Sequence, residues 1–84
     1  MTNSHDFRAE LLARFNRGKE RNASFVEVTS GDIHRSVGGY PGADHRMPIC
    51  CDVMYAEMDV RDEILAAPPK GKGATLTIRY HLPR

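Results

Sequence analysis

The side chains that could do chemistry are two adjacent cysteines, Cys50 and Cys51, and two histidines before them, His34 and His45. A thiol beside an imidazole can act as a nucleophile, and thiolates with imidazoles bind zinc. Zinc sites favour ligands separated by two or more residues, so that both reach one ion, and adjacent cysteines lack this spacing. A chain of 84 residues also leaves little room for a pocket beside a core. We therefore predict no enzyme activity, no metal and no cofactor, with both cysteines as free core thiols.

Basic side chains form a second candidate site, in the segment from Ile64 to the C-terminus. This segment contains four Lys or Arg residues and no acidic residue. Two of them, Lys70 and Lys72, stand in a stretch rich in Pro and Gly (68–74), which is the composition of a loop. Lysines in such loops are often only solvated surface that keeps a strand edge soluble, and they can also contact nucleic-acid phosphates.

The elements around this loop are two predicted strands. After the loop, Leu76, Ile78, Tyr80 and Leu82 alternate with polar residues, which is the period of a strand with one buried face. Before the loop, the apolar run 63–67 is short and ends at a proline. Because glycines in the loop allow the chain to turn back, the sequence predicts a C-terminal β-hairpin with a basic tip.

Three helices and one more strand are predicted before the hairpin. Apolar side chains recur at helical spacing in 6–17, with Gly18 at the expected C-cap, and residues 1–5 are expected to be disordered. A strand is predicted at 25–28, a second helix at 30–37 and a third helix at about 48–58. One sulfur-rich stripe of the third helix is interpreted as a core face; it contains Met47, Cys51, Met54 and Met58.

Composition limits the class of protein. The chain is 27% charged and 40% hydrophobic, as expected for one small globular domain covering 1–84. Its net charge of +1 gives no overall attraction to polyanions, so a basic binding face requires that the charges be segregated. No apolar run approaches the roughly 18 residues of a membrane-spanning helix, and no signal-peptide core is present. We expect a cytoplasmic protein with no membrane contact.

The predicted order is helix, strand, helix, helix, strand, strand, in an α+β domain. This order, with its basic hairpin loop, resembles the winged-helix superfamily over nearly the whole chain. The resemblance implies a helix-turn-helix made of 30–37 and 48–58, a third helix that enters a DNA groove, and a hairpin that serves as the wing. The stretches VGGYPGADHRMPICC and PPKGKGATLTIRYHLPR are also similar to a little-characterised small bacterial domain, which occurs alone or beside restriction-type genes.

The winged-helix resemblance implies a set of contacts to double-stranded DNA. Lysines in the loop would contact phosphates, and an arginine can bridge two acceptors of guanine. The candidate DNA-binding residues are Arg35, His45, Arg46, Tyr55, Lys70, Lys72 and Arg79. This hypothesis predicts that the basic residues of the set share one face. Asp52 and Glu57 argue against it, because negative charge on the third helix weakens the approach of phosphate.

The alternative is a protein-interaction module of the same fold that does not bind DNA. It predicts an exposed apolar patch on the third helix, formed by Ile49, Val53 and Tyr55, with the loop lysines elsewhere. A homodimer is compatible with the DNA hypothesis, because one small domain covers only a few base pairs. The sequence leaves the oligomeric state open.

Overall fold

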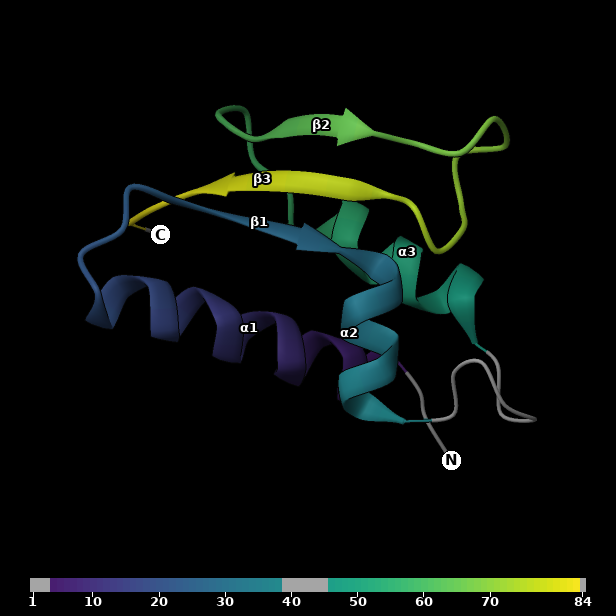
Figure 1. Ribbon diagram of the computed structural model, residues 1–84, viewed down its shortest axis with the longest axis horizontal. Helices are drawn as coiled ribbons and strands as arrows, with labels where there is room; N and C mark the ends of the chain where they lie inside the picture. The colour runs from purple at the N-terminus through teal and green to yellow at the C-terminus, as the bar shows by residue number, and fades with distance from the viewer. Residues whose placement is uncertain (1–3, 39–45, 84) are drawn as a thin grey trace.

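The computed structural model describes residues 4–38 and 46–83, which form three helices and a three-stranded antiparallel sheet. The elements are α1 (Ser4–Glu20), β1 (Phe25–Thr29), α2 (Ser30–Val37), α3 (Met47–Ala56), β2 (Glu63–Ala66) and β3 (Thr77–His81) (Figure 1). The predicted α+β class and the predicted order of elements are confirmed. The arrangement is compatible with a winged-helix layout.

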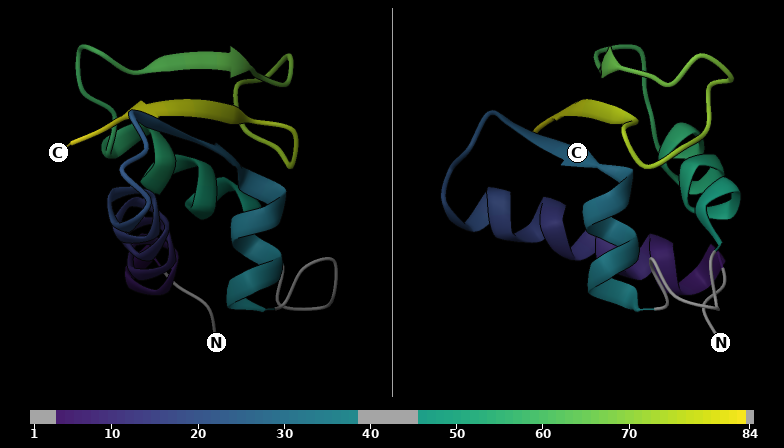
Figure 2. Two further views of the ribbon diagram at one scale, coloured as in Figure 1. Left: turned by 60° about the vertical axis from the view of Figure 1, so that its left-hand side comes forward. Right: turned by 45° about the vertical axis from the view of Figure 1, so that its right-hand side comes forward.

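The sheet has the strand order β1-β3-β2, with β3 in the centre. Ile78 of β3 lies opposite Val28 on one side and opposite Ile64 on the other. The predicted alternation is confirmed, since the four apolar side chains that alternate along 76–82 are buried. The helices lie on one side of the sheet, and β2 extends beyond them (Figure 2). The result is a two-layer domain with its core between the helices and the sheet.

Aromatic side chains join the two layers. Phe7, Leu11 and Phe15 recur on one face of α1 and are buried, as their spacing predicts. The ring of Phe15 lies 4.9 Å from the ring of Tyr80 on β3. The Tyr80 hydroxyl donates a hydrogen bond, 2.7 Å long, to the carbonyl oxygen of Met54 on α3. A buried hydroxyl needs such a partner, so this bond fixes α3 beneath the sheet.

Two predictions about α1 were wrong. Ser4 and His5 were expected to be disordered, but they belong to the first turn of α1; residues 1–3 lie outside the described part. Gly18 is not the C-cap, because α1 continues to Glu20 and the left-handed residue that follows it is Asn22, with φ 57°. A Cβ atom on Gly18 would lie only 2.7 Å from a methyl of Val26. The glycine is needed for close packing of α1 on the sheet.

The remaining elements lie close to their predicted positions. α2 has the predicted bounds, and β1 is one residue longer than 25–28. α3 was predicted to end at Met58 but ends at Ala56, where the chain leaves for the turn before β2. The strands of the hairpin are each shorter than the apolar runs that predict them. Within the described residues, no helix is long and apolar enough to cross a membrane.

Candidate nucleic-acid interface

The loop between β2 and β3 (67–76, here called the β2–β3 loop) folds against α3. The hydroxyl of Tyr55 on α3 donates a hydrogen bond to the carbonyl oxygen of Gly71. One turn earlier on α3, the sulfur of Cys51 lies 3.3 Å from both the backbone nitrogen and the carbonyl oxygen of Gly73. These contacts use the polar atoms of α3 that face the loop, so the loop is held at a fixed position beside the helix.

The start of α2 holds the other side of the same loop. The hydroxyl of Ser30 donates to the carbonyl oxygen of Gly73 at 2.5 Å. The backbone N–H of Gly31 donates to the carbonyl oxygen of Ala74 at 3.1 Å. A backbone N–H in the first turn of a helix has no partner within the helix, and the loop supplies one for the N–H of Gly31. α2, α3 and the β2–β3 loop therefore form one connected surface.

Lys72 and Asp52 form an ion pair across this surface. The Lys72 Nζ lies 2.7 Å from the Asp52 Oδ1, and both side chains are about half exposed. The hydrogen bond with Asp52 raises the pKa of Lys72 above its ordinary value. The other acidic residue near α3, Glu57, pairs with Arg8 of α1 at 3.2 Å. The two acidic residues that argue against the approach of phosphate, Asp52 and Glu57, thus each have a cation beside them. Lys70 is exposed at the tip of the loop.

The cysteines are free, as predicted, and both are buried in the core. Burial, and secondarily the neighbouring Cys51, raise the pKa of the Cys50 thiol to about 12. A neutral buried thiol is a poor nucleophile and a poor metal ligand, since both functions need the thiolate. Within residues 4–38 and 46–83, no three His, Cys, Asp or Glu side chains gather into a metal-binding group.

His34 has a structural contact at the start of α3. Its ring is buried, and its Nε2 accepts a hydrogen bond, 2.8 Å long, from the backbone N–H of Arg46. The ring of Phe7 packs against it edge-on at 4.9 Å. The histidine therefore fixes the backbone of Arg46, a candidate DNA contact. His45, another candidate, lies outside the described residues.

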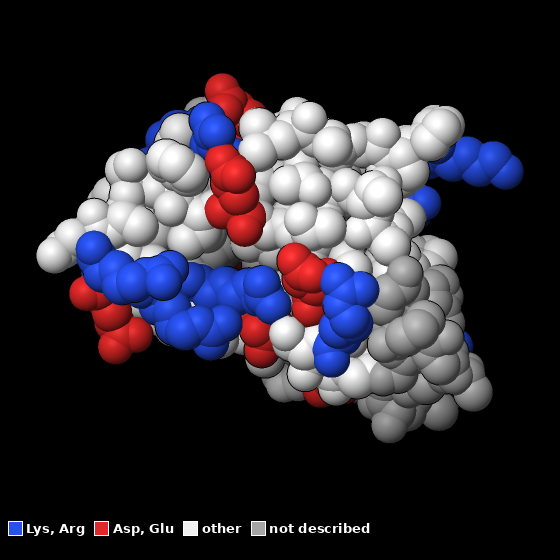
Figure 3. Space-filling view, viewed as in Figure 1, with Lys and Arg blue, Asp and Glu red and all other residues white. Residues whose placement is uncertain are grey.

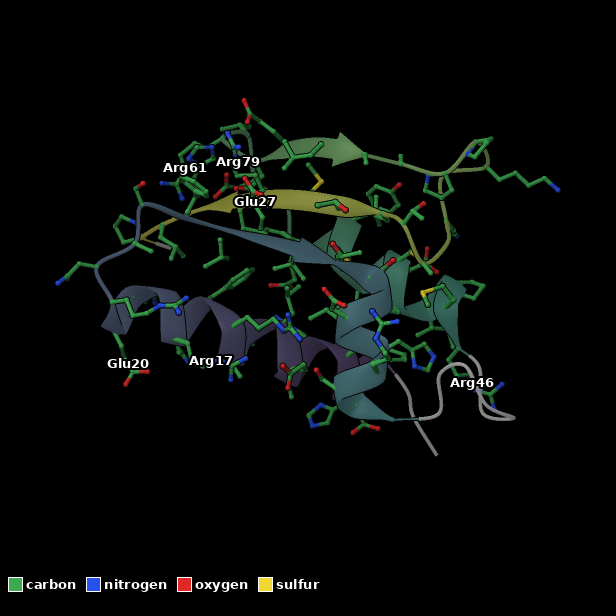
Figure 4. All side chains as sticks on the ribbon, in the orientation of Figure 1. Arg17, Glu20, Glu27, Arg46, Arg61 and Arg79 are labelled. Carbon is green, nitrogen blue, oxygen red and sulfur yellow. The ribbon has the colours of Figure 1, made fainter. Side chains whose placement is uncertain are left out.

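Two other candidate residues are paired with acidic side chains, and one of them, Arg79, lies away from this surface. Arg79 is held by Glu27 at 2.7 Å and by Glu63 at 3.5 Å, on the sheet face that the helices leave uncovered. Figure 4 shows Arg79 and Arg46 at opposite ends of the molecule. Arg35 on α2 pairs with Asp32 at 2.5 Å. The candidate basic residues thus do not all share one face; Tyr55 and Lys72 meet in direct contacts between α3 and the loop.

The exposed side of α3 carries few groups that can recognise bases. Its exposed residues are Pro48, Ile49, Asp52 and Ala56, and the whole helix contains no Lys, Arg, Asn or Gln. Val53, which was expected in an exposed apolar patch, is only 9% exposed and packs in the core. Tyr55 is half-buried, with its hydroxyl bound to the loop. Ile49 is the part of the expected patch that remains exposed.

Arginines on α1 form a basic band that is not part of the predicted DNA-binding set. Figure 3 shows Lys and Arg side chains as a band over α1 that reaches α2. Arg14 contacts Glu10 at 3.1 Å and the hydroxyl of Ser36 on α2 at 2.9 Å, and Arg17 contacts Glu10 at 3.4 Å. Their spacing of three residues, which places them on one helix face, was the available signal. Because Arg14 joins α1 to α2, part of this band supports packing.

Comparison with known proteins gives no family model, no curated protein and no solved structure that matches this chain.

Proposed function

We propose that this chain is a winged-helix domain that binds double-stranded DNA with α3 and the β2–β3 loop. The observation that supports this most is the Lys72–Asp52 ion pair, which places a basic loop against α3 and offsets the acidic charge of that helix. Lys70 is exposed at the tip of the same loop, and Arg46 precedes α3. The order of elements and the sheet order also agree with a winged helix.

The proposed binding is directed mainly at the DNA backbone. Lys and Arg side chains near phosphates give affinity without sequence information, whereas base recognition needs side chains that reach base edges. Because α3 has no basic or amide side chain, we expect weak sequence preference. With Arg46, Lys70 and Lys72 as phosphate contacts, the slope of log K against the logarithm of the salt concentration should be no steeper than about −2.7. The partial neutralisation of Lys72 by Asp52 should make the slope smaller.

The test is the binding of the purified protein to a mixed-sequence duplex at several low salt concentrations, measured by fluorescence anisotropy. The variant Lys70→Ala/Lys72→Ala should weaken binding and reduce the salt slope by up to about two. The control Lys19→Ala/Arg21→Ala removes the same charge from the exposed end of α1 and the turn that follows it, and should affect binding much less. Absence of binding at low salt, where backbone contacts are strongest, would reject the proposal, as would equal effects of the two double variants.

Ile49 is the observation that favours the second candidate, a protein-interaction module. It is 36% exposed on a helix surface that otherwise carries Pro48, Ala56 and the paired Asp52. An apolar surface without basic residues suits a protein partner better than phosphate. The neutral variant Ile49→Ser separates the two functions, because it leaves the charge of α3 unchanged. It should weaken binding to a protein partner that docks on α3 without weakening DNA binding, whereas Lys70→Ala/Lys72→Ala should leave the binding of such a partner unchanged.

A further inference from the structure

β2 is an edge strand with exposed residues along its whole length. The sheet order places β3 on one side of it, and all four of its residues are exposed. In every ribbon view β2 lies at the outer margin of the molecule (Figures 1 and 2). An exposed strand edge offers unpaired N–H and C=O groups to another strand.

Apolar side chains gather at this edge. Among the described residues, six large apolar side chains are at least 36% exposed, and three of them, Val60, Ile64 and Leu65, lie within six consecutive positions. Val60 is fully exposed, Ile64 is 47% exposed and Leu65 is 43% exposed. Lys and Pro commonly protect an exposed strand edge, and β2 contains neither. Pro68, Pro69 and Lys70 all follow the strand.

The charges on either side of β2 have opposite signs. The segment before and at its start, 59–63, has three acidic residues and one arginine, which gives a net charge of −2. The segment after it, 68–72, contains two lysines and no acidic residue; because Asp52 offsets one of them, Lys72, the charge that remains at this end is +1. An antiparallel copy of the same strand would place each negative end opposite a positive end. A parallel copy would place like charges together, which is unfavourable.

We propose that two copies of this chain associate through β2 in an antiparallel pair about a two-fold axis. The axis is perpendicular to the sheet, because only a two-fold axis in this direction joins two copies of one edge strand antiparallel in a continuous sheet. It passes near Leu65. The product is a six-stranded sheet with the helices of both copies on the same face. The contact is self-complementary, as a two-fold interface requires. It uses none of the proposed DNA-binding side chains except the two lysines, which contribute charge at its margins.

The association should be weak. β2 has four residues, and its pairing with β3 is irregular between Ile64 and Ala66, so few residues can pair across the axis. Such a contact buries less than the roughly 800 Å² per partner of a stable interface. We therefore expect a dissociation constant between about 100 μM and 1 mM, and a monomer in dilute solution.

The test is sedimentation equilibrium of the full chain up to about 1 mM, where a dimer of this strength should be populated. Leu65→Lys places a charge opposite its own copy at the axis and should raise the dissociation constant at least about tenfold. The control Leu12→Lys changes a side chain of similar exposure, 39%, on α1. Its dissociation constant should stay within about twofold of the wild-type value. A wild type that remains monomeric, or equal effects of the two variants, would overturn the proposal.

A cross-linking experiment locates the contact independently of affinity. Leu65→Cys should form an intermolecular disulfide with its own copy under mild oxidation, because the two positions meet near the axis. The native thiols are buried and should not take part. Leu12→Cys is the matched control and should remain unlinked. Failure of the Leu65→Cys variant to cross-link, or equal cross-linking of the control, would contradict a β2 dimer without bearing on DNA binding.

Discussion

Lys72 in the β2–β3 loop reaches back to Asp52 on α3, with its Nζ 2.7 Å from the Asp52 Oδ1. Both side chains are about half exposed, so the pair adds little to stability. The main effect of the pair is on the electrostatic field of the proposed DNA-binding surface. The attraction of Lys72 for phosphate and the repulsion of phosphate by Asp52 offset each other.

Removal of the Asp52 charge should therefore strengthen DNA binding. Asp52→Asn keeps the size of the side chain, removes a repulsive charge and leaves Lys72 available to phosphate. We expect about a two- to fivefold higher affinity at low salt, together with a steeper salt dependence. Anisotropy titrations with the duplex measure both. Glu20→Gln, which removes an exposed charge at the end of α1, is the control and should change affinity less. Weaker binding by Asp52→Asn would contradict the proposed surface.

The bond between Tyr55 and Gly71 should hold the β2–β3 loop on α3. Tyr55→Phe removes this bond and should lower the free energy of unfolding by about 0.5–1.5 kcal/mol, measured in urea. It should also accelerate amide hydrogen exchange within the loop. The comparison variant is Tyr80→Phe, which removes the buried bond to Met54 and should destabilise the protein without a selective effect on the loop. Unchanged loop exchange in Tyr55→Phe would show that other contacts hold the loop.

Local patterns predicted much of the fold. The bounds of α2 followed from Ser30 at its start and Gly38 after its end, and the alternation along 76–82 identified the buried face of β3. These signals depend on residues that are close in sequence. The role of Gly18 could not be read in this way, because its neighbours are Val26 on β1 and Leu82 just after β3, and Leu82 is more than sixty positions away in the sequence.

The candidate site was less predictable than the fold, for the same reason. Arg79 looked available on its strand, but its partner Glu27 is 52 residues away and becomes a neighbour only when β1 pairs with β3. The contact of Lys72 with Asp52 likewise requires the loop to fold onto α3. Charge in a sequence indicates which residues can bind a phosphate. The ion pairs formed on folding decide which of them remain available.

Gly18 gives a stability prediction whose sign is opposite to helix propensity. Alanine is favoured over glycine within a helix by roughly 1 kcal/mol. At this position a Cβ would lie 2.7 Å from the Val26 Cγ1 and 2.8 Å from the Leu82 Cδ1, so one side must move. We expect Gly18→Ala to destabilise the protein by about 1–3 kcal/mol in urea unfolding. Asn16→Ala, on the exposed side of α1, should be neutral or slightly stabilising. A stabilised Gly18→Ala protein would mean that α1 can shift away from the sheet.

Cys50 should make the fold sensitive to alkaline pH. Burial, and secondarily Cys51, raise its pKa from 9.0 to about 12, so the folded state keeps the thiol proton to higher pH than the unfolded state does. This contribution to stability is fully present below about pH 9 and is lost as the pH rises toward 12, by about 1.4 kcal/mol per pH unit. Urea unfolding between about pH 8 and pH 10.5 measures the slope.

The variant Cys50→Ala separates this titration from the general effect of alkali. It removes the thiol, so its free energy of unfolding should fall less steeply above about pH 9 than that of the wild type, even if it starts lower because of the cavity. Val53→Ala shortens another α3 side chain without removing a titratable group, and it should keep the wild-type slope. The Cys50 sulfur lies 3.6 Å from the carbonyl oxygen of Ser30, beneath the start of α2. Equal slopes for the wild type and Cys50→Ala would show that water nevertheless reaches the Cys50 thiolate in the folded protein.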